Sequence, residues 1–145
     1  MAFRLSAAAL AVAALVWLAP SGAAQTPERF KVRLSTVPMD GGMRNTVAGT
    51  GSAIASLTGA TLSIAGTFEG LKSPATAATL HTSPARGVRG ASVADLVVSK
   101  AVRGTLSGSV ALTPEQLKAL REGRLYVELA SEKAPDGNLW GWILK

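Results

Sequence analysis

Residues 104–145 read GTLSGSVALTPEQLKALREGRLYVELASEKAPDGNLWGWILK, and the alternation of side chains in this stretch decides the fold class. Apolar or small residues alternate with polar ones over 104–112 and again over 124–131, which is the period of half-buried β-strands. Residues 138–144 return as a final strand. Between the first two strands, Thr113-Pro114-Glu115-Gln116 carries the capping-box pattern of a helix N-terminus. We therefore expect strand, short helix, strand, turn and strand.

Two glycines mark the ends of elements in this unit. Gly123 supplies the left-handed stop of the helix near 113–122, which is too short to be stable unless it packs on a sheet. Ala134-Pro135-Asp136-Gly137 is typical of a tight turn, with the positive φ at the glycine. A hairpin closed by this turn places Ala134 opposite Asn138 and Ala130 opposite Trp142. A slip by one residue would exchange the two faces.

The earlier part of the chain continues the same architecture. Strand patterns recur at 29–37, 48–57, 60–68, 74–82 and 91–98, with turn residues between them. In the first of these strands Lys31 and Arg33 face away from the apolar side. Many short strands at this spacing and one helical pattern predict an all-β, antiparallel, Greek-key-like sandwich or barrel with one short helix near 113–122.

The motifs of the terminal unit resemble the C-terminal signature of the CHRD (chordin) domain family. The matching segments are LTPEQ at 112–116, GRLYV at 123–127 and PDGNLWG at 135–141, and the resemblance extends over roughly residues 30–144. It implies an immunoglobulin-like or superoxide-dismutase-like all-β fold. It implies no settled biochemical activity.

The first 24 residues have the pattern of a cleavable signal peptide. Arg4 provides the positive start, an apolar run over 5–19 follows, and small residues over 20–24 suit the cleavage site. The run is shorter than a membrane span requires, so we expect no transmembrane span after processing. Residues 25–145 would then form a single CHRD-like β domain, exported to the periplasm or the extracellular space. The chain has no cysteine, which suits a disulfide-free bacterial exported protein.

His81 is the only histidine and the centre of the enzyme alternative. One imidazole cannot build a transition-metal site, which needs several converging ligands. CHRD domains commonly carry His-x-His where this chain has Thr79-Leu80-His81, so the resemblance implies that ligands are missing here. We therefore expect no metal, no cofactor and no catalytic residue. The alternative is a barrel-scaffold hydrolase or metal-dependent redox enzyme using His81.

A second candidate feature is a basic patch on either side of the strand at 91–98. It consists of Arg86, Arg89, Lys100 and Arg103, in a chain whose formal net charge is +6. Nucleic-acid modules interleave aromatic side chains with such cations, and no aromatic residue occurs between Phe68 and Tyr126. We expect no nucleic-acid partner. A solvated face is one interpretation of the patch, and binding of an anionic envelope polymer or lipid headgroup is the other.

Trp140 and Trp142 form the most unusual feature of the sequence. They are two residues apart on the last strand, so both point to one face of the sheet, near Tyr126. Large exposed apolar patches usually have a use. The sequence leaves two interpretations open: an interaction face formed by Tyr126, Trp140 and Trp142, or aromatic rings covered by another segment. We expect a non-enzymatic, exported binding or structural module for an unknown protein or envelope ligand, and a homodimer through the terminal hairpin remains an alternative.

The first prediction concerns export. The exported protein should lack residues 1–24, because the charged start, apolar run and small-residue site together direct cleavage. Intact mass of the protein recovered outside the cytoplasm measures this directly. A mass that still contains residues 5–19 would show that the segment is an anchor.

Overall fold

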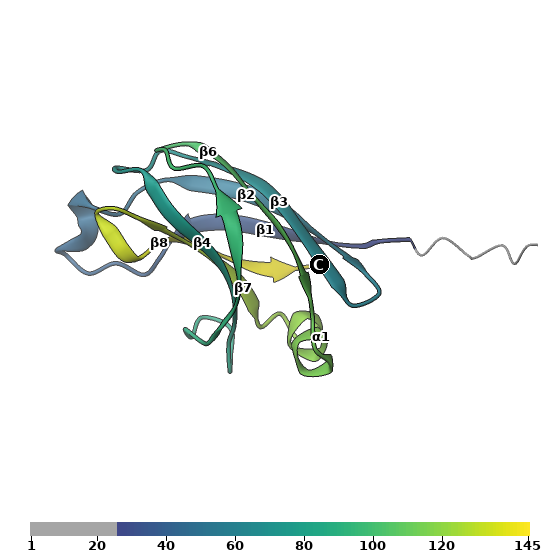
Figure 1. Ribbon diagram of the computed structural model, residues 1–145. Coiled ribbons are helices and arrows are strands. Elements are labelled where there is room, and N and C mark those ends of the chain that lie inside the picture. The colour runs from purple at the N-terminus through teal and green to yellow at the C-terminus, as the bar shows by residue number, and fades with distance from the viewer. Residues whose placement is uncertain (1–25) are drawn as a thin grey trace, which may run out of the picture.

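The computed structural model describes residues 26–145, and the predicted signal peptide at 1–24 lies outside the described residues. Eight antiparallel strands form a closed barrel in the order β1-β2-β3-β6-β5-β4-β7-β8 (Figure 1). The strands are β1 Glu28–Thr36, β2 Thr50–Thr58, β3 Thr61–Glu69, β4 Ala75–Thr82, β5 Ser92–Val98, β6 Gly104–Ala111, β7 Leu125–Ser131 and β8 Ala134–Leu144. The remaining elements are a short 3-10 helix, η1 (Met43–Asn45), and one α-helix, α1 (Pro114–Arg121). The all-β prediction is confirmed, and closure selects the barrel over the sandwich.

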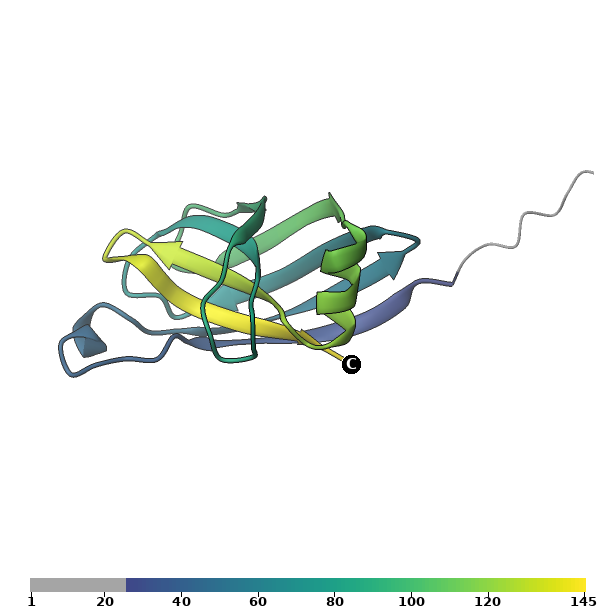
Figure 2. The ribbon, with the colours of Figure 1, turned by 90° about the horizontal axis from the view of Figure 1, so that it is seen from below.

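The strand order is a Greek key, because the chain leaves β3 and crosses to β4 before β5 and β6 fill the space between them. β6 is followed by α1, which lies at the end of the barrel from which β7 starts (Figures 1 and 2). The first and last strands then pair with each other, with Val32 opposite Ile143 and Thr36 opposite Leu139. The barrel is therefore closed by segments more than 100 residues apart in sequence.

Alternation along each strand places the core inside the barrel. On β1 the side chains of Phe30, Val32 and Leu34 are buried, whereas Lys31 and Arg33 face solvent. The same period buries Leu125, Val127 and Leu129 of β7 and Leu139 and Ile143 of β8. Within residues 26–145 no helix is long and apolar enough to span a bilayer.

The capping box of α1 forms as the sequence predicts. The backbone N–H of Gln116 donates to Thr113 Oγ1 at 3.2 Å, and the backbone N–H of Thr113 donates to Gln116 Oε1 at 2.9 Å. Ala119 and Leu120 are the buried positions of the helix. Gly123 follows with φ 69°, the left-handed stop that the sequence indicated.

The terminal hairpin differs from the prediction in its turn and its register. β8 begins at Ala134, directly opposite Ser131, so the turn consists of residues 132–133. Residues 135–137 lie inside β8, where the register shifts and Gly137 has φ 130°. The residue opposite Trp142 is Tyr126, whereas we expected Ala130 in that position. From Tyr126 to Leu129 the error is four residues, an even number, so the side chains of this part of the hairpin keep their predicted faces.

The irregular segment in β8 is held by a buried side chain that the sequence did not single out. Asn138 donates from Nδ2 to Ser131 Oγ at 2.9 Å and accepts the backbone N–H of Ala48 at Oδ1 at 3.2 Å. Both Asn138 and Ser131 are fully buried. These bonds anchor the bulge to the opposite strand and to the loop before β2, which favours the early turn.

Substitution of either positive-φ glycine should destabilise the barrel. Gly123→Val and Gly137→Val each force a β-branched residue into the left-handed region, at a cost on the order of 1–3 kcal/mol. Denaturant unfolding measures the loss. Gly41→Val is the control, because a Cβ there meets nothing within 4 Å and the backbone needs no positive φ. Equal midpoints for all three variants would contradict the argument.

Candidate functional site

Four aromatic rings gather on the outer face of β4, β7 and β8. His81, Tyr126 and Trp142 lie side by side because His81 pairs with Tyr126 and Tyr126 pairs with Trp142 across the three strands. The imidazole stacks on the Tyr126 ring with centroids 4.9 Å apart, and Trp142 lies 4.7 Å from the same ring. Trp140 contacts both, at 5.9 Å from Tyr126 and 5.5 Å from Trp142. We call His81, Tyr126, Trp140 and Trp142 the aromatic cluster.

Tyr126 faces outward from the barrel and is nevertheless only 1% exposed. The loop between β4 and β5, residues 83–91, crosses the outer side of β7 and β8 (Figure 2). The backbone N–H of Gly90 donates to the Tyr126 hydroxyl at 3.0 Å, and His81 Nδ1 lies 3.2 Å from the Gly90 carbonyl oxygen. One loop residue thus holds two rings of the aromatic cluster in place.

Arg89 fastens the same loop to the sheet. Its guanidinium donates to Glu128 Oε2 of β7 at 2.8 Å and to the backbone carbonyl of Asp136 in β8 at 2.7 Å. Glu128 is directly opposite Trp140, so this ion pair borders the aromatic cluster. The Arg89 guanidinium also lies close to the bulge, because a Cβ added to Gly137 would be 3.1 Å from it. The positive charge of Arg89 is therefore paired with Glu128 within the protein.

The two tryptophans are half-buried, between the exposed and covered states that the sequence left open. Trp140 packs on a small apolar group outside the barrel that includes Val37, Val47 and Ala134. Trp142 rests on Tyr126. Each indole is held on one side and is partly open to solvent on the other.

The four cations predicted as one basic patch do not come together. Arg86 and Arg89 lie in the loop before β5, whereas Lys100 and Arg103 lie in the loop after it. A strand of seven residues separates the two loops by roughly 20 Å. Lys100 donates to the backbone carbonyl of Thr76. The two pairs of cations are close in sequence because they flank one strand. That strand is extended, so it places the two pairs at opposite ends of the barrel.

The structure places a different group of cations beside the tryptophans. Arg29, Lys31 and Arg33 are exposed and lie in line on the outer face of β1, and we call them the cationic row. β1 is hydrogen-bonded to β8, which carries Trp140 and Trp142. The alternation of β1 predicted the direction of these side chains. It could not predict their neighbours, because those depend on closure of the barrel.

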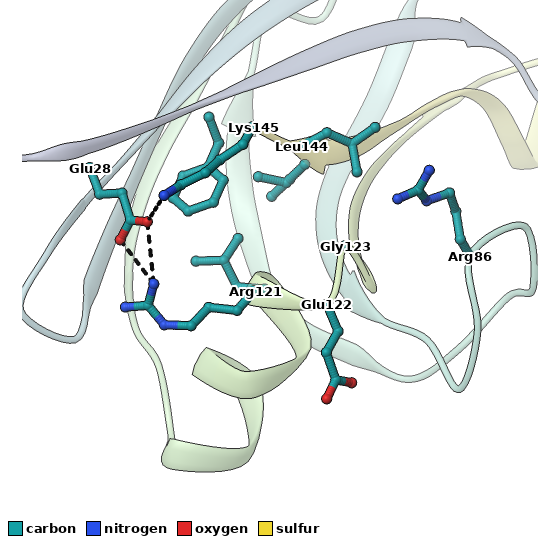
Figure 3. A pocket seen from close by; sticks show the side chains of 10 residues that line it. Glu28, Arg86, Arg121, Glu122, Gly123, Leu144 and Lys145 are labelled. Atoms are coloured by element: carbon teal, nitrogen blue, oxygen red, sulfur yellow. Dashed lines mark hydrogen bonds and ion pairs between the residues drawn. The ribbon is translucent and has the colours of Figure 1, made fainter.

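Arg86 faces a pocket of about 460 Å³ between the end of α1 and the end of β8 (Figure 3). Phe30, Leu120 and Ile143 are among the residues that line this pocket. At one side Glu28 forms ion pairs with Arg121 and Lys145. The hydrogen bond from Lys145, followed by the contribution of Arg121, lowers the pKa of the Glu28 carboxyl below its usual value. Opposite charges therefore share this pocket.

His81 contacts the Gly90 carbonyl oxygen through Nδ1 and stacks on the Tyr126 ring. The hydroxyl of nearby Ser83 donates to the backbone carbonyls of Ala85 and Val88, within its own loop. Among residues 26–145 no group of three His, Cys, Asp or Glu side chains is arranged to hold a metal ion. The contacts of His81 with Tyr126 and Gly90 give it a role in packing the loop.

Taken together, these features define a class of protein: a disulfide-free Greek-key barrel with an ordered aromatic cluster on its outer wall. The family model of the CHRD domain matches residues 30–143. The chain belongs to the CHRD domain family, as its terminal motifs indicated. CHRD domains are in general non-catalytic, and membership of the family supports a binding or structural role in general terms. No curated protein and no solved structure matches the chain.

The contact between Gly90 and Tyr126 can be tested by removing one hydroxyl. Tyr126→Phe should lower the free energy of unfolding by about 1 kcal/mol, the usual net value of such a bond. Amide exchange at Gly90 should accelerate because its N–H loses its acceptor. Ser107→Ala, at an exposed position of β6, should change neither quantity. Unchanged exchange at Gly90 would show that the loop is held by other contacts.

Proposed function

We propose that the protein is an exported, non-catalytic binding module whose working surface is formed by Trp140 and Trp142. Tyr126, which the sequence predicted as part of this surface, is buried and supports the two indoles from beneath. The observation that carries the proposal is the position of the two half-exposed tryptophans on a fully buried tyrosine. Aromatic side chains that are already ordered lose little conformational freedom when they bind, so their contact area contributes efficiently to affinity. Membership of the CHRD family supports a binding role in general.

The surroundings of the aromatic cluster support the same proposal. Arg89 and Gly90 fix the loop 83–91 against Tyr126, so the edge of the surface is ordered before any partner arrives. Polar groups border the rings, with Glu128 on one side and exposed cations of β1 on the other. An apolar centre with a polar margin is the common anatomy of a binding surface. The predicted signal peptide supports a place in the cell envelope or outside the cell.

Binding to the cell envelope tests the proposal. We expect the processed protein to sediment with isolated envelopes of the cell that produces it, and we expect Trp140→Ser and Trp142→Ser to weaken this binding at least several-fold. Val97→Ser is the matched control, because Val97 is 74% exposed on β5, away from the aromatic cluster. Sedimentation of the wild type with no loss in the tryptophan variants would contradict the proposed surface. Failure of the wild type to bind would contradict the function.

Stability measurements separate loss of binding from loss of folding. Substitutions of exposed residues usually change stability by less than about 0.5 kcal/mol, and truncation of a buried tryptophan costs about 3–5 kcal/mol. Because both indoles are half-buried, we expect each serine variant to fall between these values. Sedimentation velocity of the same proteins tests the homodimer alternative. A dimer that dissociates in both variants would assign the surface to a second copy.

A further inference from the structure

The outer face of β1 continues the aromatic cluster without a gap. In the register of β1 and β8, Lys31 is opposite Leu144 and Ser35 is opposite Trp140. The same register places Arg33 beside Trp142. Side chains directly opposite each other in an antiparallel pair have their Cβ atoms about 5 Å apart. The cationic row therefore begins at Arg33, beside Trp142, and continues along the neighbouring strand past Leu144.

The charges of the cationic row are not neutralised within the described structure. Among residues 26–145, the ion pairs use other cations, and Arg29, Lys31 and Arg33 take part in none of them. Alternate residues of a strand are spaced by roughly 6.6 Å, so the row extends over roughly 13 Å. Three exposed cations in this space form a surface that attracts anions.

Apolar side chains are interspersed with these cations. Ile54 of β2 is directly opposite Lys31 and is 45% exposed. Leu144 flanks Lys31 on the other side and is half-buried, and the open sides of Trp140 and Trp142 continue the same surface. We call the surface formed by Ile54, the cationic row, Leu144, Trp140 and Trp142 the outer wall. A ligand that matches this wall must carry negative charge and apolar or amphipathic groups along one line.

We infer that this wall binds the surface of a lipid membrane containing anionic lipids. The inference rests on the proposed function and names the ligand of that same surface. Tryptophan favours the boundary between headgroups and acyl chains, where its ring is buried and its N–H stays near polar groups. Arginine and lysine bury their aliphatic stems there and keep their charges at the headgroups. Anionic lipids attract basic segments at the membrane surface.

The shape and composition of the wall favour a membrane over a soluble acidic polymer. The wall of a closed barrel is convex, so it touches a plane along a line such as the one formed by the cationic row and the tryptophans. An acidic polymer would use the cations and leave Ile54 in water, whereas a bilayer interface accommodates both. The apolar side chains beside the cations, Ile54 and Leu144 together with the open sides of the tryptophans, thus favour the lipid surface.

Binding to vesicles tests the inference with the processed chain. Vesicles of phosphatidylcholine with added phosphatidylglycerol should bind the protein, and vesicles of phosphatidylcholine alone should bind it much more weakly. Each of Arg29→Gln, Lys31→Gln and Arg33→Gln should weaken binding roughly five-fold, the effect of one basic residue at an anionic membrane, and the triple variant on the order of 100-fold. Arg103→Gln, Lys118→Gln and Lys133→Gln combined is the matched control, because it removes three exposed cations elsewhere on the barrel.

Fluorescence reports whether the tryptophans enter the interface. Trp140 and Trp142 are the only tryptophans after residue 24, so their emission should move to shorter wavelength on binding and be quenched by lipids brominated on the acyl chains. Binding that is equal for the row variant and the control, or that leaves the emission unchanged, would overturn the inference.

The outcome also separates this inference from the proposed function. Loss of envelope binding in the tryptophan variants, with no binding to anionic vesicles, would overturn the membrane inference and leave the binding module intact. Saturable binding to a soluble acidic polysaccharide, with no vesicle binding, would assign the wall to a polymer instead. Absence of binding to both envelopes and vesicles would overturn both proposals.

Discussion

The antiparallel pairing of β1 with β8 is the interaction on which the rest of the structure depends. It joins the two ends of the described chain and removes the open edges that an eight-stranded sheet would otherwise present. Leu34 and Ile143 are both completely buried inside the barrel that this pairing closes. With no cysteine in the chain, closure and the enclosed core take the place of cross-links. The same pairing brings the cationic row to the tryptophans, so fold and proposed surface share one cause.

The loop at 83–91 shows how an outer wall can hold a second ordered layer. A tyrosine that faces away from the core would normally be exposed. Here Gly90 accommodates the close approach of backbone, since a Cβ at this position would meet the carbonyl oxygen of Thr82, and its N–H reaches the Tyr126 hydroxyl. Arg89, in the same loop, adds charge-assisted hydrogen bonds to two strands, to Glu128 of β7 and to the Asp136 carbonyl of β8. Order in the aromatic cluster therefore comes from hydrogen bonds of the loop as well as from packing of the rings.

Several elements of the site were predictable from local pattern, and others were not. The strand period placed Trp140 and Trp142 on one face with Tyr126, and this arrangement survives the four-residue error in register because the error is even. The grouping of Arg86 and Arg89 with Lys100 and Arg103 was wrong, because proximity in sequence across a strand means separation in space. The role of Asn138 as a buried anchor had no local signal. Its partners, Ser131 and Ala48, are defined only by the fold.

By itself the sequence determined the features that depend on neighbours within a few residues. These are the positions of the helix and of the strands other than the start of β8, the capping box of Thr113 and Gln116, the positive φ of Gly123 and Gly137, and the family signature of the last forty residues. Only the tertiary structure decided the closed barrel, the covering of Tyr126 by the loop and the place of the cationic row beside Trp142. The physical reason is that strand pairing is made between residues far apart in the chain. A period of two tells which way a side chain points and leaves open which strand it will lie beside.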